Sequence, residues 1–318
     1  MSQLRLIAGM LSAGVMFGAS SVSGQDYPNK PVRIITAGAG GPVDFLSRQI
    51  AQGISGPLGQ PVIVENRTGA LAAEALSKAP SDGYTLGVLG GAVWISPLLR
   101  PMSYDVVRDF SPITQVERTV NVLAVHPSLP VKSVKELIAL AKARPGELNY
   151  ASDAVGGRGH LSGELFKTMA GVNIVHVPYK GGAPATTALV SGEVQLLIFG
   201  VGLVMPQAKA GKMKALAVTS AEPSALTPGL PTVAASGLPG YESVGISGLF
   251  APARTPVTII NRLNQETIRY LNRPEVKERF VNAGAELATG TPEQFGSAVT
   301  LEISKWGKVI KDAGIKAD

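Results

Sequence analysis

Two glycine-rich turns contain the residues whose types and spacing could bind a ligand. The first turn, "AGAGGPVD" at residues 37–44, follows the apolar stretch "VRIIT" and precedes a segment with helical spacing. A strand that ends in small residues and leads into a helix leaves unpaired backbone N–H groups and a partial positive charge at the helix start. Phosphates and carboxylates both satisfy such groups, so the turn predicts an anion-binding site.

The spacing in this first turn argues against a nucleotide. A dinucleotide fingerprint needs glycines at its first, third and sixth positions, but Gly38 and Gly40 are followed by Val43, and no Walker lysine follows. Pro42 suits the first turn of a helix because it has no N–H to satisfy. Asp44 either caps that helix or contacts a ligand. A small carboxylate therefore fits the turn better than a nucleotide does.

The second turn, "DAVGGRGHL" at residues 153–161, repeats this design in the other half of the chain. Its glycines allow the backbone to approach a ligand closely. Arg158 adds a planar cation that could hold a carboxylate, and the alternative is an exposed arginine that is simply solvated. His160 fits a structural hydrogen-bond partner better than a catalyst. The two turns together indicate a single binding site with two sides.

Known catalytic patterns are missing from the sequence. His126, His160 and His176 show no metal-ligand spacing, and neither an "HExxH" nor a "GxSxG" motif occurs. The chain has no cysteine, which excludes disulfides, a thiol nucleophile and a lipidated cysteine. We therefore expect no metal and no cofactor. An enzyme whose catalytic residues assemble only in space stays open as a less favoured alternative.

Length and charge favour a two-lobed protein that binds small solutes. At 318 residues the chain exceeds one minimal core, and two lobes would leave a cleft between them. The formal net charge is +6, but the basic residues are scattered and few aromatic residues accompany them. This pattern argues against nucleic-acid binding. A mild positive field would attract anionic solutes.

The first 24 residues are typical of a secretory signal peptide. Arg5 precedes an apolar run shorter than the ~20 residues that a membrane span needs, and Val22, Ser23 and Gly24 form a small-residue end. We expect cleavage near Gly24, with a retained anchor as the alternative. Removal of this segment deletes one positive charge, so +6 minus 1 leaves a mature charge of +5.

After this segment, strand and helix signals alternate along the chain. The stretches "VRII", "QPVIVEN" and "YTLGVLGG" predict strands, and Leu46, Ile50 and Ile54 place one apolar face on a helix between the first two. Alternation of this kind predicts parallel strands joined by crossover helices. The expected fold class is α/β.

Three further helices are predicted in the second half of the chain or just before it. The stretch 133–146 opens with Ser133 and Glu136, which is the pattern of a capping box. The helix after the second glycine turn should bury Leu161, Leu165 and Met169. A final amphipathic helix should pack back on the body through five residues: Phe295, Val299, Ile303, Trp306 and Ile310.

Long stretches of the chain also match one known family. They include "YPNKPVRII", "GGPVD", "LGQPVIVENRTGA", "HPSLPVKSVKELIALAKARPGELNYAS" and "HLSGELFKTMAGVNIVHVPYKGGAPA". With these residues the sequence closely resembles the Bug family, the periplasmic solute receptors of tripartite tricarboxylate transporters. The resemblance implies a two-lobe periplasmic binding protein of type II, a Venus-flytrap fold with two hinge crossings. Residues 25–123 and 245–318 would form the first lobe, and residues 124–244 the second.

The resemblance also implies a set of ligand-binding residues at strand ends and helix starts. In the first lobe they would be Ala39, Gly40, Gly41, Val43, Asp44, Gly90 and Gly91. In the second lobe they would be Ala154, Gly156, Gly157, Arg158, His160, Lys180, Gly181, Pro184 and Gly200.

Several of these positions depart from the family pattern by losing a polar side chain. Two departures, Leu89 and Gly90, follow the third predicted strand. The others are Val43, Gly157, Gly200 and Ile246. One outcome is a site for a bulkier or more apolar acid, such as an aromatic carboxylate, with Arg158 replacing the lost donors. The other is a weak binder with a regulatory role.

The function implied by the resemblance is capture of a small organic carboxylate for membrane transporter subunits. A receptor that presents its ligand to a sensor kinase is the first alternative, and an α/β enzyme is the second. We expect a periplasmic monomer that binds no nucleic acid and no cofactor.

Overall fold

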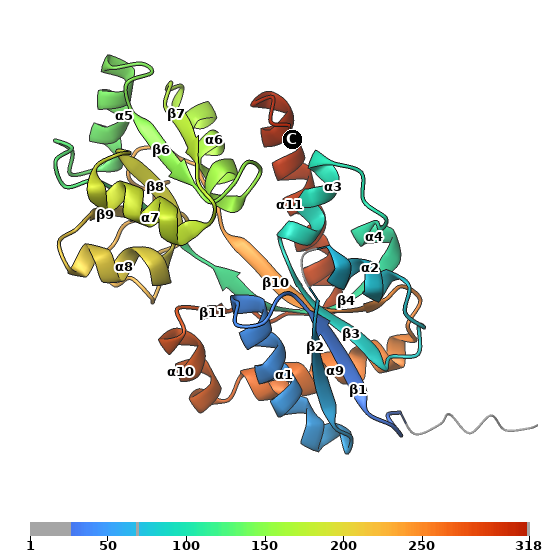
Figure 1. Ribbon diagram of the computed structural model, residues 1–318. Helices are drawn as coiled ribbons and strands as arrows, with labels where there is room; N and C mark the ends of the chain where they lie inside the picture. The colour runs from blue at the N-terminus through green and yellow to red at the C-terminus, as the bar shows by residue number, and fades with distance from the viewer. Residues whose placement is uncertain (1–26, 68–69, 317–318) are drawn as a thin grey trace, which may run out of the picture.

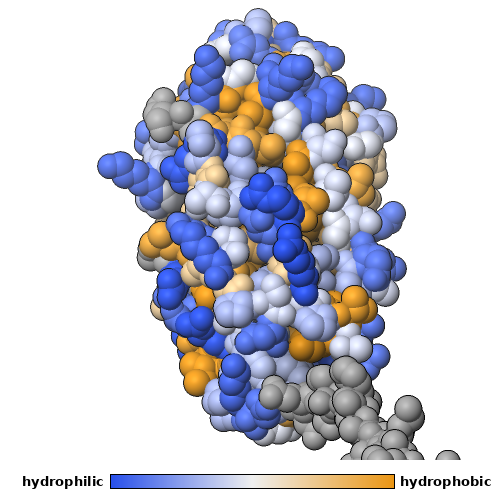
Figure 2. Space-filling view, turned by 90° about the vertical axis from the view of Figure 1, so that its right-hand side faces the viewer, coloured by the Kyte–Doolittle hydropathy of each residue, from blue (hydrophilic) through white to orange (hydrophobic). Residues whose placement is uncertain are grey.

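The computed structural model describes residues 27–67 and 70–316. The signal peptide predicted for residues 1–24 lies outside them. Two β-sheets, each flanked by helices, form two lobes that are joined near the middle of the molecule (Figure 1). No helix within the described residues is long and apolar enough to cross a membrane. Figure 2 shows one face of the molecule, where apolar residues form separate patches between hydrophilic side chains.

The first lobe is built on a six-stranded sheet in the order β11-β4-β10-β3-β1-β2. β1 runs parallel to β2 and β3, whereas β10 is antiparallel to β3 and β4. The strands are β1 (Val32–Thr36), β2 (Val62–Asn66), β3 (Thr85–Gly90), β4 (Phe110–Thr119), β10 (Gly245–Pro252) and β11 (Glu286–Leu287). The helices are α1 (Pro42–Leu58), α2 (Leu71–Ser77), α3 (Ala92–Leu99), α4 (Val106–Asp109), α9 (Val257–Leu271), α10 (Pro274–Asn282) and α11 (Pro292–Asp312).

The second lobe repeats this arrangement in a five-stranded sheet of order β7-β6-β8-β5-β9. Three parallel strands lie beside an antiparallel strand in both sheets. The strands are β5 (Asn121–Val125), β6 (Asn149–Ser152), β7 (Val175–Pro178), β8 (Leu196–Gly200) and β9 (Lys214–Val218). The helices are α5 (Val134–Ala143), α6 (Arg158–Ala170), α7 (Gly182–Ser191) and α8 (Val201–Lys209). The predicted α/β fold with parallel strands is confirmed.

The chain crosses between the two sheets twice. It leaves the first sheet at Val120, between β4 and β5, and returns along residues 219–244. The crossings lie side by side, because the Asn121 amide and the Thr219 hydroxyl both donate to the Ser243 carbonyl, at 3.1 and 2.7 Å. The boundary expected after residue 123 falls inside β5. The stretch "VNVLAV" contains one turn-forming residue, Asn121, and no glycine or proline marks the point where the chain leaves the first sheet.

The predicted helix faces are mostly confirmed. Leu46, Ile50 and Ile54 of α1 are fully buried, and in α11 only Ile303 of the five predicted residues is partly rather than fully buried. Met169 of α6 is 38% exposed, so its predicted burial is wrong. Two four-residue steps turn a position about 80° around the helix, which stays within the buried face of α1 but not within that of α6.

The predicted capping box of α5 forms only in part. The Ser133 hydroxyl accepts the Glu136 N–H at 3.2 Å, but the Glu136 carboxylate accepts the N–H of Lys132 rather than that of Ser133. A complete capping box does start α11, between Thr291 and Gln294. Its two reciprocal hydrogen bonds fix the start of the helix that lies along α3 and reaches α6 of the second lobe.

Candidate functional site

A cavity of about 570 Å³ lies between the two lobes. The first lobe lines it with the first glycine turn and the start of α1, the ends of β3 and β4, β10, and parts of α2 and α3. The second lobe lines it with β8 and with the second glycine turn where it enters α6. An adjoining cavity of about 570 Å³ is lined by the second glycine turn and α3. Both cavities include Arg100, Asp153 and Arg158 in their walls. The glycine turns of the two lobes therefore approach one region.

A larger cavity elsewhere has the wrong chemistry for an anion. It measures about 680 Å³ and lies between α9 and α11, away from both glycine turns. Its one charged lining residue is Glu293, which would repel a carboxylate. The inter-lobe cavity is the better candidate.

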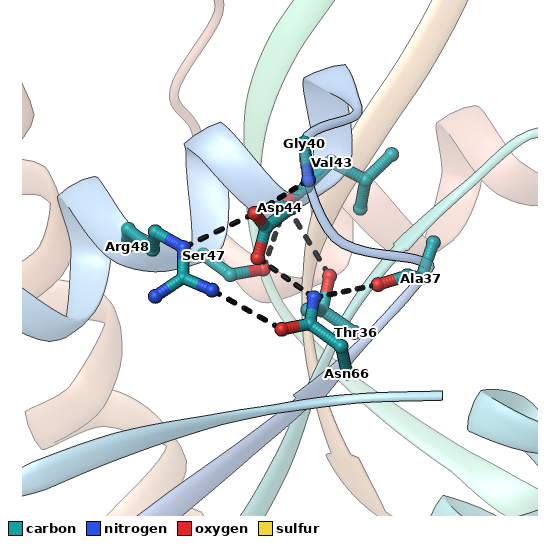
Figure 3. Close-up of polar contacts among 8 residues, drawn as sticks. All are labelled: Thr36, Ala37, Gly40, Val43, Asp44, Ser47, Arg48 and Asn66. Atoms are coloured by element: carbon teal, nitrogen blue, oxygen red, sulfur yellow. Dashed lines mark hydrogen bonds and ion pairs between the residues drawn. The ribbon is translucent and has the colours of Figure 1, made fainter. Parts of the chain in front are cut away.

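The first glycine turn is held in place by Asp44 (Figure 3). The Asp44 carboxylate accepts hydrogen bonds from Gly40 N–H at 3.0 Å, from Arg48 Nε at 3.1 Å and from Asn66 Nδ2 at 2.7 Å. Asn66 also donates to the Ala37 carbonyl at 2.8 Å. Asp44 is 5% exposed, so its oxygens are engaged inside the protein. These contacts position the turn, and none of them is a side-chain cap at Gly41, the N-cap of α1.

These contacts also determine the protonation of Asp44. Burial by itself raises the pKa, but the hydrogen bonds from Asn66, Gly40 and Arg48 outweigh it and hold the pKa at about 2. The carboxylate is thus charged at neutral pH and complements the start of α1. Gly40 has a φ of +80°, a backbone conformation that residues other than glycine rarely adopt.

Arg158 is one of two arginines that line the site, and it is the one predicted from the sequence. It is the first residue of α6, and its guanidinium extends from the second lobe to the first-lobe strand β10. There it fills the space that a side chain at Gly245 would occupy, because a Cβ at that position would overlap Nη1. Burial lowers the pKa of Arg158, although a guanidinium stays charged at neutral pH.

One nitrogen of this guanidinium has an unmet hydrogen bond. Arg158 Nη1 is buried and has no hydrogen-bond partner among the described residues. Glu117, Glu302 and Asp153 act on the guanidinium by charge, but no salt bridge with any described residue joins it. A buried donor without an acceptor costs free energy, about 1–3 kcal/mol or more for a charged group. Nη1 is therefore suited to a ligand oxygen.

His160 supports the second glycine turn from behind. Its Nδ1 accepts the N–H of Gly156 at 2.9 Å, and its ring stacks on His176 with centroids 3.8 Å apart. Burial lowers the pKa of both imidazoles, and that of His176 falls to about 4 because burial acts together with the neighbouring His160. Both rings are thus neutral at neutral pH, which leaves Nδ1 of His160 free to accept.

The remaining predicted residues divide by whether they line the two cavities. Val43, Gly90, Gly91 and Gly200 line the inter-lobe cavity together with Arg158. The lining of the adjoining cavity includes Ala154, Gly156 and Gly157. The predicted residues outside both linings are Ala39, Gly40, Gly41, Asp44, His160, Lys180, Gly181 and Pro184.

A row of polar residues inside the strands was not predicted from the sequence. Glu117, Thr119, Asn121 and Ser247 all line the inter-lobe cavity. Glu117 on β4 is the register partner of Ser247 on β10, which in turn pairs with Gly90 on β3. Directly opposed residues share one face of a sheet, so these positions form its cleft-facing floor. The sequence did contain one signal for these residues, the charged Glu117 within the strand "ITQVERT". The prediction did not use it, because it was based on the glycine-rich turns.

The site contains the groups for binding an anion and few groups for reacting with one. Backbone groups of the glycine turns, hydroxyls and two arginines, Arg100 and Arg158, line it, and no cluster of three metal-ligating side chains occurs among the described residues. These groups hold a carboxylate by hydrogen bonds and charge.

Comparison with known proteins agrees with this geometry. Residues 46–315 match the family model described as "Tripartite tricarboxylate transporter family receptor". The chain belongs to this family. The receptor is 34% identical to Protein BugT of Bordetella pertussis, over 99% of each chain. The match confirms the Bug-family resemblance and identifies a solute-binding receptor rather than an enzyme.

Solved structures of two relatives agree with this assignment. "R. palustris Rpa4515 with adipate" shares 39% identity and a TM-score of 0.76, covering 92% of the receptor and 99% of that chain. "MatC (Rpa3494) from Rhodopseudomonas palustris with bound malate" shares 30% identity and a TM-score of 0.71, covering 89% of the receptor and 100% of that chain. The expected two-lobe binding-protein fold is confirmed.

Proposed function

We propose that the receptor captures a small organic carboxylate in the inter-lobe cavity and delivers it to membrane transporter subunits. Arg158 carries this proposal, because its buried guanidinium lines a cavity between two lobes and its Nη1 has no hydrogen-bond partner among the described residues. Structures of relatives contain adipate and malate, which are both carboxylates. A charge-assisted hydrogen bond from Nη1 would satisfy both the donor and the ligand.

The direct contacts in this proposal are the predicted residues that line the cavity. Val43, Gly90, Gly91 and Gly200 would bring backbone close to the ligand, and Arg158 would bind its carboxylate. Asp44 and His160 would act indirectly, because each holds one of the glycine turns by hydrogen bonds. The apolar part of the lining, which includes Val88 and Leu89, leaves room for a bulky acid.

The partner and compartment are part of the same proposal. The receptor would act as a monomer in the periplasm after export, with the two crossings at Val120 and at residues 219–244 serving as hinges. Fractionation of cells and light scattering of the purified protein test the compartment and the monomer separately.

The test of the carboxylate site is a ligand screen with an arginine variant. Thermal shift and calorimetry would measure binding of dicarboxylates, tricarboxylates, amino acids and aromatic acids to the wild type. For the acid that binds best, Arg158→Ala should weaken the affinity by roughly tenfold or more, since a hydrogen bond to a charged group contributes about 1.5–3 kcal/mol. Failure of every acid to bind would refute the proposed function.

Arg144→Ala is the matched control. Arg144 follows α5 on the exposed surface of the second lobe, away from the inter-lobe cavity. This variant should bind like the wild type. An equal affinity in Arg158→Ala and Arg144→Ala would remove Arg158 from the site.

A further inference from the structure

Glu117 is a buried acid on the first-lobe floor of the inter-lobe cavity. It is 4% exposed and belongs to the cleft-facing row described above. Its Oε1 accepts a hydrogen bond from the Thr119 hydroxyl at 2.9 Å. No Lys, Arg or His among the described residues forms a salt bridge with it. Burial raises the pKa of Glu117 and outweighs the lowering effects of the Thr119 hydroxyl, the Arg158 charge and the Ser247 hydroxyl, so the protein compensates this charge only in part.

Arg158 lies on the same face of the sheet as Glu117. Gly245 is the register partner of Thr119, and Ser247 is the register partner of Glu117, so these pairs follow each other along one face. Arg158 Nη1 fills the side-chain space of Gly245 and thus lies beside this row. The charges of Glu117 and Arg158 attract each other, but the two side chains form no salt bridge. Both residues line the cavity.

The cavity therefore offers an unpartnered donor and a poorly compensated acceptor to the same ligand. A carboxylate at Arg158 satisfies the donor. A second carboxylate near Glu117 would be repelled or would need a proton, because two like charges at low dielectric are unfavourable. A hydroxyl or ammonium group near Glu117 would instead donate to its carboxylate and needs no change of protonation.

We propose that Glu117 is a specificity-determining residue that accepts a hydrogen bond from a hydroxyl or ammonium group on the carboxylate held by Arg158. The inference rests on the proposed function and narrows its ligand class to hydroxy acids and amino acids. Plain acids of the same shape are discriminated against, because they leave the buried Glu117 carboxylate without this donor.

Calorimetry with matched acids at neutral pH tests the proposal. Three sets share a carbon skeleton: succinate, malate and aspartate; glutarate, 2-hydroxyglutarate and glutamate; and 3-phenylpropionate, 3-phenyllactate and phenylalanine. In the set that binds best, the hydroxy acid or the amino acid should bind about tenfold or more tightly than the plain acid. The ratio of the Kd values of the hydroxy acid and the amino acid identifies whether a hydroxyl or an ammonium group donates to Glu117.

Glu117→Gln tests the residue itself. This substitution keeps the shape of the side chain and removes its charge. The affinity ratio of the hydroxy acid or amino acid to the plain acid should therefore fall to near unity or reverse. Glu302→Gln is the matched control, because Glu302 is also a buried acid that acts on Arg158 by charge, but it lies on α11 outside the cavity lining. That variant should keep the wild-type preference.

The outcomes separate the two proposals. Plain acids that bind as tightly as their donor-bearing partners would overturn the role of Glu117 and leave the carboxylate receptor intact. A preference that survives Glu117→Gln would also overturn it. If no acid of any kind binds, the proposed function fails and this inference fails with it. The preference of the wild type is measurable even if Glu117→Gln does not fold.

Discussion

At the scale of single residues, two predicted site residues hold the backbone of the glycine turns. Asp44 fixes the first glycine turn and His160 fixes the second, each through the N–H of a glycine in that turn. Neither residue lines the inter-lobe cavity. Their substitution should therefore change stability as well as affinity, whereas substitution of Arg158 should change mainly affinity.

Asp44→Ala removes an acceptor of three hydrogen bonds in a buried position. We expect the free energy of unfolding to fall by about 2 kcal/mol or more, measured by urea unfolding, because hydrogen bonds to charged groups contribute about 1.5–3 kcal/mol. Glu275→Ala is the matched control, since Glu275 is an exposed acid in the first turn of α10. A loss as small as that of the control would show that Asp44 does not hold the turn.

The stacked pair His160 and His176 makes stability depend on pH. Burial, and for His176 the neighbouring His160, lowers the folded-state pKa, which for His176 moves from 6.5 to about 4. The unfolded chain then binds protons at higher pH than the folded protein does. The contribution of the neutral pair to the free energy of unfolding should be fully present above about pH 6.5. It should be lost progressively as the pH falls toward about 4.

Urea unfolding over this pH range measures the effect. His176→Gln removes the lowered pKa and should flatten the dependence on pH. His126 lies outside the stacked pair, and His126→Gln is the matched control. Equal flattening in both variants would contradict the assignment to the pair.

At the scale of elements, β10 joins the two sides of the site. It returns from the second lobe into the first sheet between β3 and β4, and its first residues lie against Arg158 of α6. Gly245 is not among the glycines with a left-handed φ, so a side chain is compatible with its backbone. The absence of a side chain there is explained by the guanidinium that fills the space.

Gly245→Ser should therefore act through Arg158. A side chain at this position displaces Nη1, and we expect calorimetry to show a loss of ligand affinity similar to that of Arg158→Ala, roughly tenfold or more. The double variant Gly245→Ser/Arg158→Ala should be no worse than either single variant, since both remove one interaction. Additive losses would show that Gly245 matters for another reason.

Gly56→Ser is the control for this substitution. A Cβ at Gly56, near the end of α1, meets no atom within 4 Å. Its ligand affinity should match that of the wild type.

At the scale of the whole molecule, two adjacent crossings connect lobes that share a ligand cavity. The Ser243 carbonyl accepts hydrogen bonds from both Asn121 and Thr219, so the crossings are tied together. We expect motion of the lobes relative to each other to pivot at this point. A ligand that contacts both lobes stabilises their closed arrangement by its own binding energy.

A bound acid should stabilise and compact the receptor together. At a ligand concentration of about 100 times Kd, the free energy of unfolding should rise by about 2.7 kcal/mol. Small-angle scattering should show a smaller radius of gyration under the same conditions. A rise in stability without compaction would contradict closure, because it would mean that the ligand binds one lobe alone.

The sequence by itself determined the repeating α/β elements, the two glycine turns and the family. These features depend on local patterns: a strand followed by small residues, or apolar residues spaced by one helical turn, as at Leu46, Ile50 and Ile54. The same kind of spacing gave one wrong prediction, the burial of Met169, which lies off the buried face of its helix.

Only the tertiary structure decided which side chains meet in the cavity. Glu117 and Ser247 are distant in the chain and become neighbours because β10 pairs with β4. The place of Arg158 depends on a glycine in that same returning strand. Strand order is set by how all the helices and both crossings pack, and no short window of sequence contains that information.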